Sequence, residues 1–244
     1  MKFPLPVNQK TQKNLNKAGR RHEKGLTFPC RQTLPHFQAK GMGPTDFFEQ
    51  AARARGFQRI GGLDEAGRGP LAGPVVAAIV ILPRHWSPDL LDDSKLLSEQ
   101  QRQTLYEVIT TRAFAWAIGE ASEQEIDELN ILGATRLAGC RAIAQLPIPP
   151  DYLLLDALDL PTVSVPQRPI IKGDQLSLSI AAASILAKVS RDRIMNTYHE
   201  RFPQYQFHLH KGYPTQEHLR RLHQFGPCPG HRRSFRPVQA CLDA

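Results

Sequence analysis

The sequence predicts an α/β domain with a five-stranded mixed sheet flanked by helices and a helical extension at the C-terminal end. Three apolar segments, 59–63, 75–82 and 113–121, lie close enough together in the chain to form an antiparallel meander. The segment 152–156 is apolar until its final acid, which is typical of a buried parallel strand that presents a side chain at its carboxyl edge. We expect a fifth strand, at the edge of the sheet, over 162–165.

Helices are predicted before, between and after these strands. A short helix over 45–55 comes first, and the capping box from Ser98 to Gln101 begins a helix that runs from 99 to about 111. A second capping box begins at Ser122 and predicts a helix to about 129, after which Asn130 caps another.

The C-terminal half contains two further helices. Small residues within a helix over about 176–198 would let it lie close against the sheet. Thr215 caps a helix over 216–225, which Gly226-Pro227 ends. We therefore divide the chain into an extension over 1–43, a domain over 44–238 whose helical part starts at about 198, and a tail over 239–244.

Positive charge is concentrated at the N-terminal end. The formal net charge is +8, and residues 1–41 carry nine Lys or Arg against Glu23 alone, so the rest of the chain sums to zero. We interpret this extension as a disordered tail that adds non-specific affinity for nucleic acid; the alternative is that translation begins at Met42. Residues 201–238 carry seven Lys or Arg and one acid, which favours phosphate contacts by that segment.

Neither a membrane segment nor a metal-binding cysteine framework is predicted. The longest apolar run, 71–82, contains Gly73 and Pro74 and is too short and too broken to span a bilayer. The four cysteines form no Cys-x-x-Cys pair, so we expect reduced thiols and a cytoplasmic location. Cys228 and His231 have the spacing of half a zinc site, which alone is weak support for zinc.

Candidate chemistry begins where the first strand ends. Asp64 and Glu65 follow Leu63, and carboxylate oxygens are ligands that suit Mg²⁺ or Mn²⁺. Because neighbouring strand residues point to opposite faces, we expect Asp64 to bridge and Glu65 to reach the metal through its carbonyl, a water or a bend at Ala66. An ordinary solvated turn is the alternative for an isolated pair of acids.

The turn that follows suits a phosphate or a sugar. Gly67 and Gly69 expose backbone N–H groups without side-chain obstruction, and Arg68 between them adds a guanidinium. Lys211 and Tyr213 form a second basic segment with one aromatic ring, which suits stacking and phosphate contact. A helix-entry loop with a buried Tyr213 is the alternative for that segment.

Two more acids complete the candidate site. Asp156 directly follows its apolar strand and is preferred to Asp159 for that reason. Asp174 precedes the long helix, where a simple N-cap is the alternative. Four converging carboxylates repel one another and raise at least one pKa, and a divalent metal ion removes that repulsion.

Six blocks, in this order, resemble ribonuclease HII, the type 2 ribonuclease H family. They comprise 62–73, 93–97, 155–156, 172–192, 210–215 and 231–238. An ordered set of blocks over about 44–238 is far more specific than any single motif. The chain departs from the family pattern at 157–160, which affects the fine geometry of that loop.

The resemblance implies a ribonuclease H-like fold and an endoribonuclease that cleaves the RNA of RNA–DNA hybrids and cuts 5′ of ribonucleotides embedded in duplex DNA. It implies two Mn²⁺ or Mg²⁺ ions and products with 5′-phosphate and 3′-hydroxyl ends. The implied metal ligands and catalytic residues are Asp64, Glu65, Asp156 and Asp174.

By the same resemblance, Gly67, Arg68 and Gly69 would read the ribose, and Tyr213 would pack on the sugar of the following deoxynucleotide. Our candidates for phosphate contact are Lys95, Lys188, Arg191 and Lys211, each of which has an ordinary solvated side chain as its alternative. The basic segment 231–236 is a further candidate for the duplex backbone.

The resemblance also implies a monomer in a bacterial cytoplasm that acts in DNA replication and ribonucleotide excision repair, with a sliding clamp as a candidate partner. The sequence leaves two alternative functions open. One is another metal nuclease on the same fold, such as a junction resolvase, which cuts branched DNA without any ribose. The other is a basic nucleic-acid-binding module whose acids only hold structure.

Overall fold

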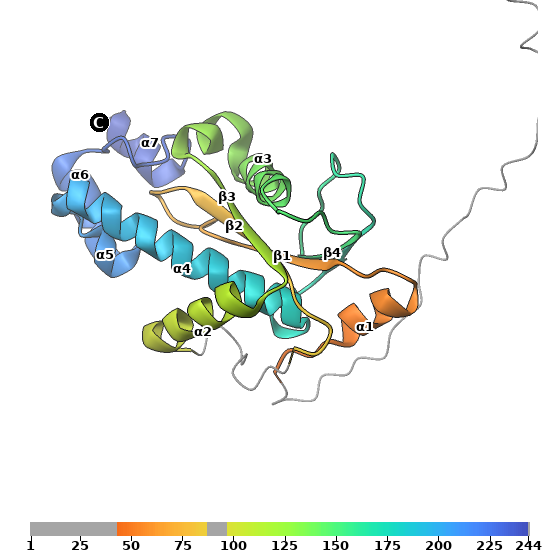
Figure 1. The fold of residues 1–244 in the computed structure, drawn as a ribbon. Coiled ribbons are helices and arrows are strands. Elements are labelled where there is room, and N and C mark those ends of the chain that lie inside the picture. The colour runs from red at the N-terminus through yellow and green to blue at the C-terminus, as the bar shows by residue number, and fades with distance from the viewer. Residues whose placement is uncertain (1–42, 87–96, 244) are drawn as a thin grey trace, which may run out of the picture. The chain divides into compact units, whose positions relative to one another are not determined.

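The computed structural model describes residues 43–86 and 97–243. All but the last residue of the predicted extension over 1–43 lies outside these residues, as does the phosphate candidate Lys95. Within them the chain forms one mixed five-stranded sheet with helices on its faces, which confirms the predicted fold class (Figure 1).

The sheet has the strand order β3-β2-β1-β4-β5. The strand bounds are β1 Ile60–Ala66, β2 Val75–Ile81, β3 Ala115–Ala121, β4 Tyr152–Asp156 and β5 Gln167–Ile170. The first three strands form the predicted antiparallel meander. β4 then pairs in parallel with β1, and β5 in parallel with β4.

The predicted edge strand over 162–165 is wrong, because β5 lies a few residues later. The Gln167 side chain accepts a hydrogen bond from the Leu160 N–H and donates to the carbonyls of Leu160 and Val163, which ties this segment into a compact loop. Val163 and Val165 pack against a buried apolar cluster from this loop. Their apolar character therefore reflects loop packing.

The first strand is longer than predicted. Its antiparallel register with β2 continues to the pair Ala66 and Val76. Asp64 and Glu65 consequently lie inside the strand, opposite Ala78 and Ala77.

Helices cover both faces of the sheet (Figure 1). Their bounds are α1 Phe47–Ala54, α2 Glu99–Arg112, α3 Glu123–Ala144, α4 Leu178–Arg201, α5 Phe207–His210, α6 Gln216–Phe225 and α7 Arg236–Leu242. α7 includes most of the predicted tail over 239–244. α3 bends at Asn130, whose side-chain oxygen accepts hydrogen bonds from the N–H groups of Leu132 and Gly133, as predicted for a second cap.

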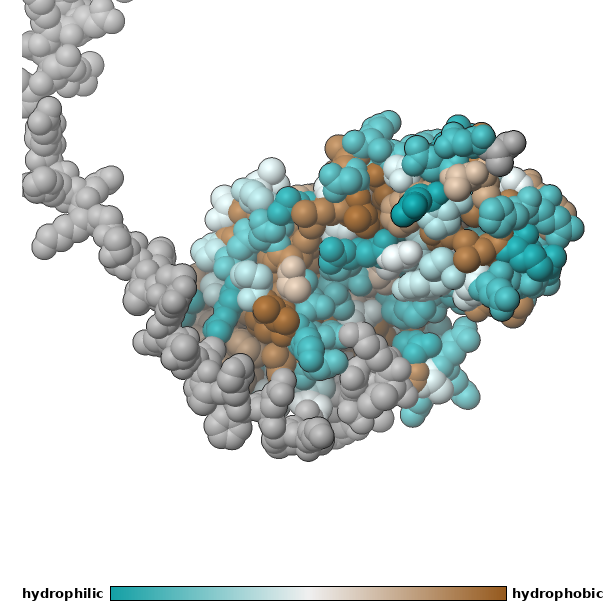
Figure 2. Space-filling view, turned by 180° about the vertical axis from the view of Figure 1, so that it is seen from behind, coloured by the Kyte–Doolittle hydropathy of each residue, from teal (hydrophilic) through white to brown (hydrophobic). Residues whose placement is uncertain are grey.

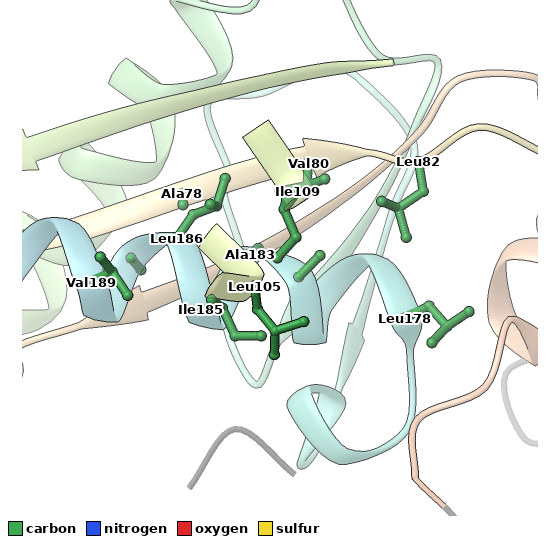
Figure 3. Close-up of a cluster of buried hydrophobic side chains, with 12 residues drawn as sticks. Ala78, Val80, Leu82, Leu105, Ile109, Leu178, Ala183, Ile185, Leu186 and Val189 are labelled. Atoms are coloured by element: carbon green, nitrogen blue, oxygen red, sulfur yellow. The ribbon is translucent and has the colours of Figure 1, made fainter. Parts of the chain in front are cut away.

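Burial on both faces explains the unbroken apolar sequence of β2. Ala78 and Val80 pack with residues of α4 and α2 in the cluster of Figure 3. Ile79 and Ile81 point the other way and pack with Ala142 of α3. Since successive strand residues alternate between faces, a strand covered on both sides contains no position that favours a polar residue.

Asp174 does not cap α4. It lies in a 3₁₀-helix, η1, over Gly173–Gln175, and the N-cap of α4 is Ser177, whose hydroxyl accepts a hydrogen bond from the Ile180 N–H. The predicted alternative, in which Asp174 serves only as the N-cap of this helix, therefore does not hold.

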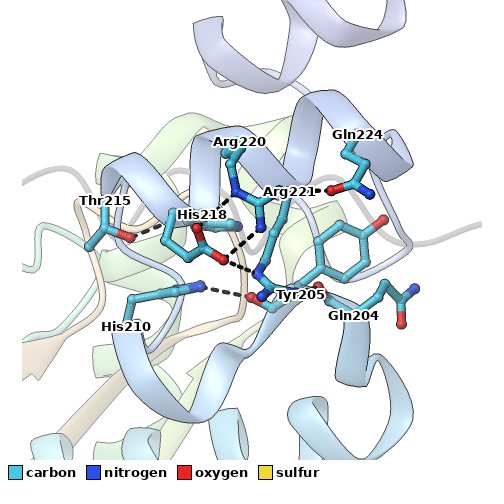
Figure 4. Close-up of polar contacts among 9 residues, drawn as sticks. Gln204, Tyr205, His210, Thr215, His218, Arg220, Arg221 and Gln224 are labelled. Carbon is cyan, nitrogen blue, oxygen red and sulfur yellow. Dashed lines mark hydrogen bonds and ion pairs between the residues drawn. The ribbon is translucent and has the colours of Figure 1, made fainter.

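The C-terminal helices follow the end of α4. Local hydrogen bonds hold this part together: the Thr215 hydroxyl caps α6 by accepting from the His218 N–H, and the His210 ring donates to the Tyr205 carbonyl (Figure 4).

Hydrophilic side chains and smaller apolar areas alternate over the face of the molecule in Figure 2. None of the helices within the described residues is long and apolar enough to cross a membrane.

Candidate active site

Parallel pairing brings the first and third acids together. Leu63 of β1 is the register partner of Leu155 of β4, so Asp64 and Asp156 follow side by side at the same edge of the sheet. Asp156 Oδ1 accepts a hydrogen bond from the Gly173 N–H, with 2.7 Å between the two atoms. This bond ties η1, and therefore Asp174, to the carboxyl end of β4.

Burial and charge repulsion act on these acids together. Asp64 is 7% exposed and Asp174 is 4% exposed. Burial raises the pKa of Asp64 well above its ordinary value, and repulsion from Glu65, Asp156 and Asp174 adds to this shift. Burial also raises the pKa of Glu65, while the neighbouring Arg68 opposes that shift. The four carboxylates therefore form one electrostatically coupled group.

The donor chemistry fits a hard divalent cation. Glu65 Oε2 is buried and has no hydrogen-bond partner among the described residues, whereas Glu65 Oε1 accepts from Arg68 at 3.2 Å. Carboxylate oxygens without thiolate or imidazole suit Mg²⁺ or Mn²⁺. Among the described residues, no group of three or more His, Cys, Asp or Glu side chains has the arrangement that would hold a metal ion.

The glycine-rich turn and the Tyr213 segment meet beside these acids. The Leu71 N–H donates to the Gly212 carbonyl at 2.8 Å, and a Cβ built on Gly69 would lie 3.7 Å from Tyr213 Cε1. Tyr213 is 43% exposed, so the alternative of a buried ring does not hold. Gly67 has φ +101°, and a Cβ there would lie 2.2 Å from Arg191 Nε, so this position requires glycine.

Two of the phosphate candidates remain partly exposed. Lys188 Nζ lies 2.7 Å from Asp192 Oδ1, and Lys211 Nζ donates to Asn196 Oδ1 at 2.6 Å. Both partners come from α4, so these lysines share one side of that helix with the Tyr213 segment. Each ammonium group is partly exposed and could exchange this side-chain contact for a phosphate oxygen.

Arg191 is not placed for phosphate contact, contrary to the sequence expectation. It is 1% exposed, and its guanidinium donates to the carbonyls of Ala72, Pro74 and Lys211 at 3.0–3.1 Å. Burial lowers its pKa. Its N–H donors hold backbone carbonyls in place, and nothing in the sequence around Arg191 predicts this role.

The basic segment 231–236 is also only partly available. His231 is 2% exposed and Arg232 is 0% exposed, while Arg233 and Arg236 remain on the surface. The Cys228 N–H donates to His231 Nδ1 at 3.1 Å, so this pair belongs to an internal hydrogen-bond network. The contacts of Arg232, which sequence reasoning missed, reach the glycine-rich turn.

A family model described as Ribonuclease HII matches residues 61–238. The chain belongs to the ribonuclease HII family. It is therefore a metal-dependent ribonuclease of a family that cleaves the RNA of RNA–DNA hybrids.

Relatives within this family cover most of the chain. Ribonuclease HII of Desulfitobacterium hafniense is 54% identical over 188 residues, which are 77% of this chain and 72% of the relative. Ribonuclease HII of Syntrophotalea carbinolica is 49% identical over 209 residues, 86% of this chain and 100% of the relative.

Solved structures of more distant ribonucleases share the fold. Ribonuclease H2 from Pyrococcus horikoshii has a TM-score of 0.64 at 24% identity, covering 76% of this chain and 98% of that one. The PCNA:RNase HII complex from Archaeoglobus fulgidus has a TM-score of 0.62 at 24% identity, covering 73% and 96%. Bst-RNase HIII in complex with Mn²⁺ has a TM-score of 0.62 at 17% identity, covering 79% and 72%.

Proposed function

We propose that this ribonuclease cuts on the 5′ side of ribonucleotides embedded in duplex DNA, as well as within RNA–DNA hybrids, and leaves 5′-phosphate and 3′-hydroxyl ends. The observation that carries this proposal is the position of the four coupled carboxylates beside the paired 67–69 and 211–213 segments. That arrangement combines a cation site with a surface for sugar and phosphate.

In this proposal Asp64, Glu65, Asp156 and Asp174 hold two Mg²⁺ or Mn²⁺ ions, which would activate water and stabilise the leaving oxygen. Asp64 would be the shared ligand, because it is buried, follows Leu63 beside Asp156 in the β1–β4 register and directly precedes Glu65. Glu65 Oε2, which has no hydrogen-bond partner within 43–86 and 97–243, supports a metal-ligand role for that side chain, since a buried carboxylate oxygen needs a cation or a donor. The solved Mn²⁺ complex of a ribonuclease HIII with the same fold is consistent with this chemistry.

Substrate recognition in this proposal uses the two adjacent segments. Backbone N–H groups of the 67–69 turn and the Arg68 guanidinium contact the ribose and its phosphate. Tyr213 packs on the sugar of the next nucleotide, which its exposure allows. Lys188 and Lys211 contact flanking phosphates, and the Coulomb attraction makes binding salt-dependent.

We further propose a sliding clamp as a protein partner, because a relative with the same fold was solved as a PCNA:RNase HII complex. The proposed setting is replication and ribonucleotide excision repair in the cytoplasm, with the chain acting as a monomer. Co-elution with a purified sliding clamp checks the partner, and light scattering of the free chain checks the monomer.

The function is tested with an end-labelled DNA duplex that contains one ribonucleotide, incubated with Mg²⁺, Mn²⁺ or EDTA and mapped at nucleotide resolution. A metal-dependent cut on the 5′ side of the ribonucleotide is expected. Cleavage of a long hybrid without that cut would remove the embedded-ribonucleotide proposal. A branched, ribose-free duplex is the control, because cutting it would indicate a junction nuclease.

A further inference from the structure

Arg232 lies beneath the glycine-rich turn and is fully buried. His231, just before it, forms an antiparallel bridge with Ala72, and the Arg232 N–H donates to the Leu71 carbonyl at 2.8 Å. The ring of Phe235 lies 5.1 Å from the guanidinium carbon. Backbone pairing and packing therefore hold this side chain in one place.

Among the residues that the structure describes, the guanidinium of Arg232 donates to backbone carbonyls of the turn and to no other group. Nη2 lies 2.6 Å from the Gly67 oxygen, and Nη1 lies 3.1 Å from the Arg68 oxygen. Nε donates to Gly73 at 2.9 Å, and Nη2 also reaches Pro74 at 3.3 Å. The planar guanidinium of arginine carries N–H donors on three nitrogens and can satisfy these acceptors together. A lysine ammonium has a single nitrogen and cannot reach all of them.

These bonds fix the direction of two N–H groups. In a trans peptide the C=O of one residue and the N–H of the next point in opposite directions. Because the Gly67 and Arg68 carbonyls point inward to Arg232, the N–H groups of Arg68 and Gly69 point to the outer side of the turn. Neither N–H donates a hydrogen bond within the described residues.

The outer side of the turn is where substrate is proposed to bind. Arg68 and Gly69 are exposed, and Gly69 adjoins Tyr213. Outward N–H groups there can donate to an oxygen acceptor, and the 2′-hydroxyl oxygen is the acceptor that distinguishes RNA from DNA.

We infer that Arg232 is a positioning residue for ribose recognition: it holds the Gly67 and Arg68 carbonyls inward and so presents the Arg68 and Gly69 N–H groups to the 2′-oxygen of the substrate. This inference rests on the proposed function. Arg191 serves the neighbouring part of the turn, because its acceptors are the carbonyls of Ala72, Pro74 and Lys211.

The test compares the full-length wild-type protein with Arg232→Lys and Arg112→Lys. Arg112, in the last turn of α2, is the matched control because its side chain is exposed and it lies outside the segments proposed to contact the substrate. Two quantities are measured at a temperature below the unfolding midpoint of every variant. One is kcat/KM for a duplex with a single ribonucleotide, and the other is the inhibition constant Ki of the all-DNA duplex of the same sequence.

For Arg232→Lys we expect kcat/KM to fall at least about ten-fold, which corresponds to about 1.4 kcal/mol, while Ki changes less than about two-fold. The all-DNA duplex lacks the 2′-oxygen, so it should not sense the misdirected N–H groups. Arg112→Lys should change neither quantity. An unchanged kcat/KM, or equal losses in kcat/KM and in affinity for the all-DNA duplex, would overturn the inference.

A second variant covers the case in which Arg232→Lys does not fold. Gly69→Pro deletes one of the two outward N–H groups at an exposed position and should give the same separation between kcat/KM and Ki. Full activity of Gly69→Pro would contradict the inference. Absence of any ribonucleotide cleavage by the wild-type protein is a different result, because it would refute the proposed function itself.

Discussion

Gly62 of β1 lies directly against the backbone of Ser179 in the first turn of α4. A Cβ built on Gly62 would lie 2.2 Å from the Ser179 carbonyl carbon and 2.4 Å from the Ile180 nitrogen. The absence of a side chain at Gly62 thus sets how closely α4 approaches the sheet. Asp64 is two residues further along the same face of β1, so this contact also sets the depth of the acid beneath α4.

Gly62→Ala should therefore destabilise the protein by about 1–3 kcal/mol or more, because the added methyl group meets backbone that cannot rotate away. Urea unfolding measures the loss. Gly69→Ala is the matched control, since its Cβ would have ordinary contact at 3.7 Å with Tyr213. Equal stability of the two variants would show that α4 can shift at little cost.

Asp64→Asn should lower cleavage at least about 100-fold, because it removes a charged ligand from the proposed cation site. Asp159→Asn is its control: Asp159 is exposed and paired with Arg136, so cleavage should persist. The rate on a single-ribonucleotide duplex in Mg²⁺ or Mn²⁺ checks both. Full activity of Asp64→Asn would remove it from the site.

Without divalent cations the same substitution should raise the unfolding temperature at neutral pH. The folded-state pKa of Asp64 is raised, so the ionised acid destabilises the fold as pH rises from about 3.8 through that higher pKa. The advantage of Asn should accordingly vanish at pH values below about 3.8. Added Mg²⁺ or Mn²⁺ should stabilise the wild type more than the variant; equal thermal shifts would contradict this prediction.

A buried histidine pair should make stability depend on pH. Nε2 of His218 and Nε2 of His231 lie 3.1 Å apart. Since the Tyr213 carbonyl only accepts, His218 Nδ1 carries a proton and its Nε2 accepts from His231, whose Nδ1 accepts from the Cys228 N–H. Both rings are therefore neutral, and burial lowers the pKa of His218 to about 4 and that of His231 to about 3.

In the unfolded chain these rings take up protons below about pH 6.5. Stability should thus be full above that pH and fall as pH drops toward the folded-state values, by at most about 1.4 kcal/mol per pH unit for each ring. Urea midpoints at pH 7.5, 6.5 and 5.5 measure the slope. His218→Gln should flatten it, whereas His223→Gln, at an exposed position on α6, should leave it unchanged.

Tyr213→Ala should lower kcat/KM on a single-ribonucleotide duplex roughly ten-fold, which corresponds to about 1.4 kcal/mol of lost aromatic contact with the sugar. Its effect on a continuous hybrid should be smaller, because the flanking sugar there is not deoxyribose. Tyr213→Phe keeps the ring and should retain most activity. Equal losses by the alanine variant on both substrates would refute a junction role for this ring.

Local sequence determined most of the secondary structure of this protein and the positions of its acids along the chain. Apolar segments predicted the meander and the parallel β4, since burial of a strand selects apolar side chains directly. The Ser98 and Ser122 capping boxes form as predicted, because each needs only neighbouring residues. The apolar segments that precede Asp64 and Asp156 pointed to buried strands, and the parallel register of β1 and β4 places these two acids side by side.

Only the tertiary structure decided which polar residues face solvent. Arg191 and Arg232 read as basic surface residues, yet their guanidinium groups are buried against carbonyls of a turn more than one hundred residues away in the chain. The edge strand was misplaced for a similar reason, since the Gln167 side chain and not backbone preference shapes residues 160–166. Burial and long-range hydrogen bonding depend on which segments meet in space, and that information is absent from any short stretch of sequence.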